Sequence, residues 1–153
     1  MAPTNDEGYV VGNYWSANGS PETGTPTTLY NDITRKIAIE MCNSEEGNML
    51  LFACLNLALA DTGISTWAAK YEHELWRPTL FIRHESAGKL QQEDWKALGA
   101  SRSNGYPGEI NFIPPFPSHT SGHAAFGCAA FQVRLCFRFL HLRTTTFLTD
   151  SAT

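Results

Sequence analysis

The stretch NSEEGNMLLFACLNLALADTGISTWAAKYEHELW, residues 43–76, decides how this chain folds. Asn43 and Ser44 precede two acidic residues, which is typical of the start of a helix. A side-chain oxygen there accepts a bond from a free backbone N–H, and the acids face the positive end of the helix dipole. The run that follows, residues 48–60, is apolar on nearly all faces, so we expect a buried central helix.

The residues on either side of this run predict further helices. After Asp61-Thr62-Gly63 the helical pattern continues through residues 64–76 until Pro78 stops it, which predicts a separate helix. On the N-terminal side, residues 28–41 carry apolar side chains at helical spacing and charged side chains on the opposite face, which predicts an amphipathic helix. Residues 1–27 are rich in Gly, Pro, Ser, Thr and Asn and are expected to form a loop.

The C-terminal half begins with a break in the helical pattern. Residues 84–117 predict a long loop with one short helical turn at QQEDWKAL. A last helix is expected from Ser121 to about Phe131, with Thr120 as its N-cap. No stretch alternates convincingly as a strand does, so the predicted class is all-α with long connecting loops.

Size and composition exclude several classes of protein. The 153 residues suit one domain, and a net charge of −4 provides no broad positive field for nucleic acid. The N-terminus lacks a signal sequence, and no run approaches the roughly twenty apolar residues of a membrane span, so we expect a soluble chain of unknown compartment. The four cysteines have no metal-type spacing and are expected to be buried thiols.

Two cations mark a candidate binding site. Lys70 and Arg77 are seven residues apart, and on one helix seven steps return to nearly the same face. Trp67 lies one turn before Lys70 and would form a wall beside both cations. The alternative is that both cations are solvated and pair with Glu74 and Glu72, and spacing alone favours this alternative.

The start of the last helix is a second candidate. If Thr120 caps it, then Ser121, Gly122 and His123 are its first positions, whose free N–H groups and helix dipole attract an anion. A histidine there can move protons near neutral pH, although a partly buried capping histidine is the plainer interpretation. Phe116, held between prolines, adds an aromatic face to a rigid approach.

Taken together, Lys-x6-Arg-Pro followed by PPFPxxxSGH resembles the vanadium-dependent haloperoxidases of the chloroperoxidase type. Their superfamily includes type 2 phosphatidic acid phosphatases and bacterial acid phosphatases. The resemblance runs from about Asn13 to Val133, which implies a partial helical-bundle domain over residues 1–133 and a divergent tail over residues 134–153. It covers only a middle part of a typical member, so the chain is expected to be a truncated fragment.

The resemblance assigns a cofactor and its ligands. It implies that Lys70 and Arg77 donate charge-assisted hydrogen bonds to the oxygens of vanadate. It also implies that Ser121 and the backbone amide of Gly122 hold another vanadate oxygen.

The same resemblance assigns the chemistry. His123 corresponds to the acid–base histidine, and Trp67 and Phe116 correspond to aromatic positions on the halide side of the pocket. The implied reaction is the oxidation of halide by hydrogen peroxide to hypohalous acid, which then reacts with a small organic acceptor. No nucleic acid or membrane is implied as a partner, and a homo-oligomer is compatible with the family.

One family motif has no counterpart in these residues. The third motif, SRxxxGxH, carries the histidine that bonds to vanadium, and the nearest segment, from Arg134 to His141, lacks its serine and glycine. No metal-bonding histidine is therefore assigned, and we expect impaired activity. Two alternatives stay open, namely a phosphatase-type hydrolase of phosphate monoesters and a non-catalytic fragment.

Overall fold

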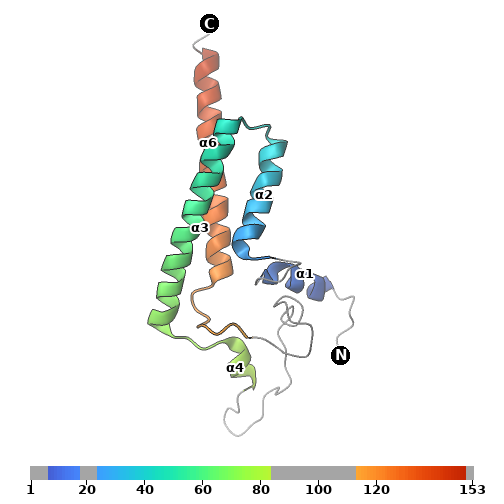
Figure 1. Cartoon of the computed structure of the whole chain (residues 1–153), viewed down its shortest axis with the longest axis vertical. Coiled ribbons are helices and arrows are strands. Elements are labelled where there is room, and N and C mark those ends of the chain that lie inside the picture. The colour runs from blue at the N-terminus through green and yellow to red at the C-terminus, as the bar shows by residue number, and fades with distance from the viewer. Residues whose placement is uncertain (1–6, 18–23, 84–112, 151–153) are drawn as a thin grey trace.

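The computed structural model describes residues 7–17, 24–83 and 113–150, and in its last helix it describes side chains as far as Arg138 (Figure 1). Within these ranges the chain forms helices and no strand, which confirms the all-α class. The helices are α1 (Glu7–Ser16), α2 (Pro26–Glu40), α3 (Glu45–His73), α4 (Pro78–Arg83) and α6 (Gly122–Asp150).

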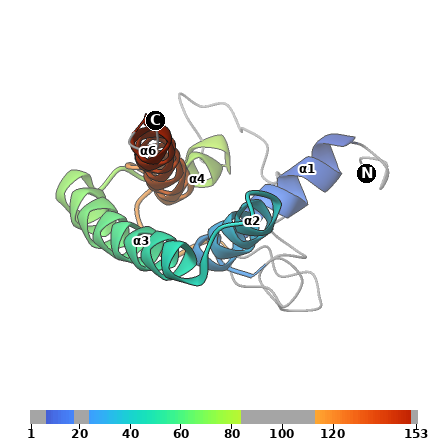
Figure 2. The same cartoon turned by 90° about the horizontal axis from the view of Figure 1, so that it is seen from above.

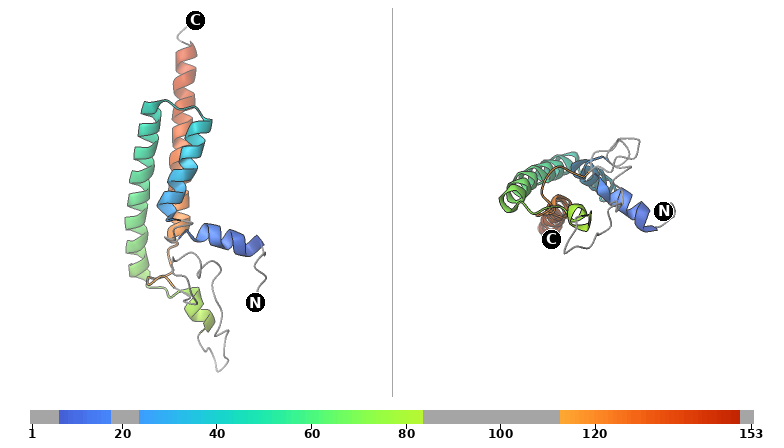
Figure 3. Two further views of the ribbon diagram at one scale, coloured as in Figure 1. Left: turned by 45° about the vertical axis from the view of Figure 1, so that its right-hand side comes forward. Right: turned by 90° about the horizontal axis from the view of Figure 1, so that it is seen from below.

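Three long helices, α2, α3 and α6, lie side by side, and α3 runs antiparallel to the other two (Figures 1 and 3). The most extensive contact is between α3 and α6. The C-terminal part of α6 extends beyond the connection between α2 and α3. At the opposite end of the group, α3 ends, α4 and α6 begin, and α1 lies close by.

The predicted amphipathic helix is confirmed as α2. Its N-cap is Thr25, whose side-chain oxygen accepts a bond from the backbone N–H of Thr28, and Pro26 follows at the first helical position. Tyr30, Thr34 and Ala38 are buried. Their spacing of four residues places them on one face, toward α3 and α6.

The predicted start of the central helix is also confirmed, because Ser44 caps α3 through a bond from the N–H of Gly47. The prediction of two separate helices was wrong. Gly63 lies inside one continuous helix, since a single interior glycine costs only about 1 kcal/mol. The helix ends at Glu74, which adopts a left-handed conformation, and Pro78 opens α4 instead of ending the preceding helix.

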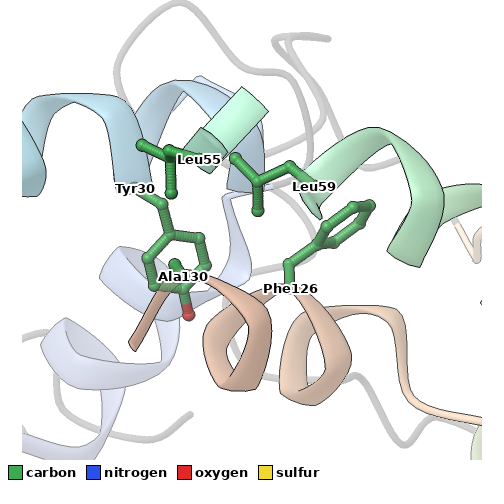
Figure 4. Packing of buried hydrophobic residues seen from close by; sticks show 5 residues of the cluster. All are labelled: Tyr30, Leu55, Leu59, Phe126 and Ala130. Atoms are coloured by element: carbon green, nitrogen blue, oxygen red, sulfur yellow. The ribbon is translucent and has the colours of Figure 1, made fainter. Parts of the chain in front are cut away.

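The prediction that α3 is buried on all sides was also wrong. One face packs inward, where Leu55 and Leu59 join Tyr30, Phe126 and Ala130 in the core (Figure 4). The opposite face carries large apolar side chains that are more than half exposed. A helix with apolar residues on all sides need not be covered on all sides by its own chain.

Both ends of the chain are more helical than expected. Residues 7–16 form α1 within the predicted N-terminal loop. The last helix continues to Asp150, well beyond Phe131, and passes without a break through the predicted domain boundary at Val133. The predicted helical turn at QQEDWKAL lies outside the described residues, so it stays a prediction.

The expectation of buried cysteines was wrong. All four cysteines, Cys42, Cys54, Cys128 and Cys136, are free and exposed, because each lies on a helix side or at a helix end that faces solvent. The segment Glu45–Arg83 is long and apolar enough to cross a membrane by length and composition, although no single run of the sequence suggested it. The core helix of a soluble protein passes the same test.

Candidate anion-binding site

A pocket of about 530 Å³ lies where α3 ends and α6 begins. Its lining includes all seven residues that the sequence assigned to the site, together with several that it did not. The lining residues are Ser16, Ala17, Thr25, Pro26, Trp67, Lys70, Arg77, Pro114, Pro115, Phe116, Ser118, Ser121, Gly122, His123 and Phe126.

Lys70 is the most deeply buried charge described in this chain. Only 2% of it is exposed, although it lies in the last turn of α3. Its Nζ donates hydrogen bonds to the backbone carbonyls of Pro117 (2.9 Å) and Ser118 (3.0 Å). It also lies 5.5 Å from the ring centre of Trp67 and 5.2 Å from that of Phe116.

Arg77 reaches the same segment from the other side. Its Nε lies 3.2 Å from the carbonyl oxygens of both Pro114 and Phe116 and donates toward them. Its guanidinium carbon lies 4.8 Å from the ring centre of Phe116. The Phe116 ring is therefore in contact range of both cations.

The prediction that the two cations share one helix was wrong, because α3 ends at His73 and Arg77 lies beyond it. They still line one pocket, since the chain turns at Glu74 and brings Arg77 back toward Lys70. The alternative of solvated cations paired with Glu72 and Glu74 does not describe Lys70, which is buried and bonded to carbonyls.

The start of α6 differs by one residue from the prediction. Ser121, not Thr120, occupies the capping position: its hydroxyl accepts a bond from the N–H of Ala124 (3.4 Å), and its carbonyl accepts the first helical bond, from Ala125. The hydroxyl of Ser121 is thus engaged in capping as well as lining the pocket. The free N–H groups at the start of the helix belong to Gly122 and His123.

Gly122 is required by the packing of Trp67. A methyl group at Gly122 would lie 3.0 Å from Cζ3 and 3.1 Å from Cη2 of the indole. Trp67 in turn packs on Phe116 and Phe126, with ring centres 5.1 Å and 6.3 Å away. The aromatic wall of the pocket therefore lies directly against the backbone at the start of α6.

His123 is exposed and bonded to the N-terminal part of the chain. Its Nε2 lies 2.7 Å from the carbonyl oxygen of Ser16, and since a carbonyl only accepts, Nε2 carries the proton. This contact fixes the tautomer and leaves Nδ1 as the nitrogen that can accept a further proton.

Ser118 is a residue of this site that the sequence did not indicate. Its backbone N–H donates to the carbonyl of Leu75 (2.8 Å), and its hydroxyl lies 3.0 Å from the carbonyl oxygen of Trp76. These bonds fasten the segment before α6 to the turn that carries Arg77. No motif or spacing would have revealed them, because they join backbone atoms far apart in the sequence.

The electrostatics of the pocket favour a negatively charged ligand. Among its lining residues there are two cations and no carboxylate. Burial lowers the pKa of Lys70, and the nearby charge of Arg77 lowers it further. Burial also lowers the pKa of Arg77. An anion would relieve the repulsion between these two cations.

The donor set fits an oxyanion such as vanadate: two cationic side chains, free helix N–H groups, hydroxyls and an imidazole surround the pocket. It is not a conventional metal site. The described part of the chain has no group of three His, Cys, Asp or Glu side chains placed to hold a metal ion.

The sequence of this chain matches one family model and one characterised protein. A family model described as "VCPO second helical-bundle domain" matches residues 50–145, a range that passes beyond Val133. The vanadium chloroperoxidase of Curvularia inaequalis is 40% identical over 131 residues, which cover 80% of this chain and 21% of that protein. No solved structure matches. The chain therefore spans about a fifth of the length of this relative.

Proposed function

Because the chain belongs to the vanadium haloperoxidase family, whose second helical-bundle domain it matches, we propose that its pocket binds vanadate as an oxyanion. The observation that carries this proposal is Lys70. Lys70 is 2% exposed, lies beside a second cation and has no carboxylate in its pocket, so its two bonds to neutral carbonyls offset only part of the cost of burying the charge, and an anion would reduce the rest. Trp67 and Phe116 add aromatic surface beside Lys70 in the same pocket.

Two cationic side chains and two backbone N–H groups would donate hydrogen bonds to the vanadate oxygens. Lys70 has three N–H donors and Arg77 has two terminal amino groups besides Nε, so both can donate to oxygens of the ligand. The N–H groups of Gly122 and His123, at the positive end of α6, would add further donors. When bound, vanadate supplies Lewis-acid activation of hydrogen peroxide.

His123 would serve as the acid–base group. With Nε2 donating to Ser16, its Nδ1 can accept a proton from peroxide and return it later. Trp67 and Phe116 would line the halide side. The products would be hypohalous acid and, through it, a halogenated small organic acceptor.

We further propose that the 153-residue chain alone is impaired. The motif SRxxxGxH, which in this family supplies another arginine and the histidine that bonds to vanadium, is not among its residues. Binding would then rest on the donors of one half-site and would be weak. Turnover of a phenol-type halogenation substrate that scales with added vanadate would contradict this part.

The binding proposal is tested by titrating the chain with orthovanadate, observed by vanadium-51 NMR. Lys70→Met keeps the length and apolar stem but removes the charge, and we expect it to weaken binding about tenfold or more. Lys36→Met removes a charge from an exposed position on α2 and is the matched control. Equal affinity in both variants would overturn the proposal. Vanadate-inhibited hydrolysis of a phosphate monoester would redirect it toward the phosphatases.

A further inference from the structure

Two histidines lie side by side where α3 ends and the chain leads into α6. His73 lies in the last turn of α3, and His119 lies in the segment before α6. Their ring centres are 5.3 Å apart, and the ring planes are tilted by 51°. Both residues are exposed, and neither lines the anion-binding pocket. The proposed binding of vanadate therefore leaves the two imidazoles unused.

Neither imidazole is engaged by another group within the described part of the chain. There, neither ring makes a hydrogen bond or an ion pair with a protein group. A neutral imidazole carries one N–H and one nitrogen lone pair, and the lone pair can bind a metal ion. Because both side chains are exposed, each ring can turn to direct a nitrogen at an ion that arrives from solvent.

The backbone holds the two histidines close together. The N–H of Ser118 donates to the carbonyl of Leu75 (2.8 Å), and the carbonyl of Ser118 accepts from Nζ of Lys70 (3.0 Å). These bonds join the residue before His119 to residues on both sides of His73. Figure 2 shows that α3 and α6, which carry or follow these residues, are neighbours when seen from above. The pair is therefore in place before any ligand binds.

We propose that His73 and His119 bind one divalent transition-metal ion of the kind that prefers imidazole, Zn²⁺ or Cu²⁺, through one nitrogen each. Two imidazoles on a tetrahedral ion, with metal–nitrogen bonds of about 2.0–2.1 Å, have ring centres roughly 5 Å apart, close to the observed 5.3 Å. Water would fill the other positions, since the described residues place no third His, Cys, Asp or Glu beside the pair. This inference does not depend on the proposed function.

The charges near the pair are compatible with a bound cation. Glu72 and Glu74 flank His73 in the sequence and are exposed, and the last turn of α3 is the negative end of its helix dipole. Lys70 and Arg77 oppose a cation, but both donate to carbonyl oxygens and line the anion-binding pocket, which the two histidines do not. Carboxylates thus lie next to one ligand, and the cations belong to a separate site.

A bound ion would join the end of α3 to the segment before α6. Positions 73 and 119 are 46 residues apart in the sequence, so an unfolded chain seldom brings the two rings together. The ion therefore binds the folded chain more tightly than the unfolded chain and stabilises the fold. Zn²⁺ should raise the melting temperature of the parent chain, and it should not do so when either histidine is replaced.

The affinity test is a calorimetric titration with Cu²⁺, which binds nitrogen ligands most tightly among the divalent first-row ions. It uses the 153-residue chain without a histidine tag, with the four exposed cysteines replaced by serine so that no thiol competes. His73→Gln and His119→Gln should each weaken binding about tenfold or more, because one imidazole then binds without its partner. His141→Gln removes a different histidine of the sequence and should leave the affinity unchanged.

Electron paramagnetic resonance of the Cu²⁺ complex identifies the ligands. The parent chain should show two coordinated imidazole nitrogens, and each single variant should show one. Circular dichroism checks that the variants keep their helices. The proposal is overturned if the three variants bind Cu²⁺ equally, if the parent complex has a single imidazole ligand, or if the parent chain binds Cu²⁺ no more tightly than free imidazole does.

Discussion

Gly127, in α6, is the position where packing against α2 leaves no room for a side chain. A methyl group there would lie 2.7 Å from the hydroxyl oxygen of Tyr30 and 3.4 Å from its Cζ. Tyr30 is buried in the core, so its ring cannot move aside freely. The substitution Gly127→Ala therefore forces α2 and α6 apart or displaces Tyr30.

Two opposing terms set the size of this effect. Replacing glycine by alanine inside a helix stabilises a protein by about 0.5–1 kcal/mol when the methyl group has room. Overpacking a core costs about 1–3 kcal/mol. We expect Gly127→Ala to lower the free energy of unfolding by about 1–2 kcal/mol, measured by urea denaturation followed by circular dichroism.

Two further variants test whether contact with Tyr30 causes this loss of stability. In Gly63→Ala the methyl group would lie at an ordinary 3.5 Å from Phe126, so the same substitution should stabilise by about 0.5–1 kcal/mol. In a Tyr30→Phe background the 2.7 Å contact no longer exists, and Gly127→Ala should cost little or nothing. The reasoning is refuted if Gly127→Ala stabilises as Gly63→Ala does, or if its cost is the same with Phe at position 30.

Three further predictions concern the site and the ends of α3. Gly122→Ala should push the Trp67 indole out of place and lower vanadate affinity several-fold in the NMR titration, while leaving the helix content intact. The pKa of Lys70 is lowered in the folded chain, so the charged form of Lys70 lowers the free energy of unfolding. This penalty disappears as pH rises through the lowered pKa toward 10.5, because Lys70 then loses its proton. The free energy of unfolding of the unchanged chain, minus that of Lys70→Met, should therefore rise with pH over this alkaline range. Ser44→Ala should cost about 1 kcal/mol in urea denaturation because it removes a helix cap, whereas Ser65→Ala, inside α3, should be neutral or stabilising.

Local signals in the sequence were sufficient for the elements that depend on neighbouring residues. The cap at Ser44 and the amphipathic helix predicted over residues 28–41 follow from side chains within a few turns, and the structure has both, although the helix begins at Pro26. The break predicted at Gly63 failed because helix continuity depends on the packing of α3 against α6 over its whole length, which outweighs one glycine. The exposure of Leu57 could not be predicted either, since hydrophobicity does not say which part of a chain will cover a face.

In the candidate site, too, the sequence predicted some features and not others. Trp67, Lys70, Arg77 and Gly122 were found from spacing and motif, and they do line one pocket. The reason given for bringing the two cations together was wrong, because a turn at Glu74, not a shared helix face, returns Arg77 to the site. Long-range bonds between side chains and backbone, such as those of Ser118, leave no periodic pattern in a sequence.

The segment 114–118 explains how two cations can be held together before any ligand arrives. Its prolines have no N–H, and its two remaining amides are already used: Phe116 donates to Pro114, and Ser118 donates to Leu75. The segment therefore offers carbonyl oxygens and no free donor, and four of these oxygens accept from Lys70 and Arg77.

These carbonyls compete with any oxyanion for the same donors. A bound ligand must either use the N–H groups that remain or displace carbonyls, so its measured affinity is reduced by the cost of rearranging the segment. Prolines limit that rearrangement, since each fixes its own φ angle. Weak binding by this half-site would thus follow from two causes, the donors that the third motif does not supply and the donors that segment 114–118 already occupies.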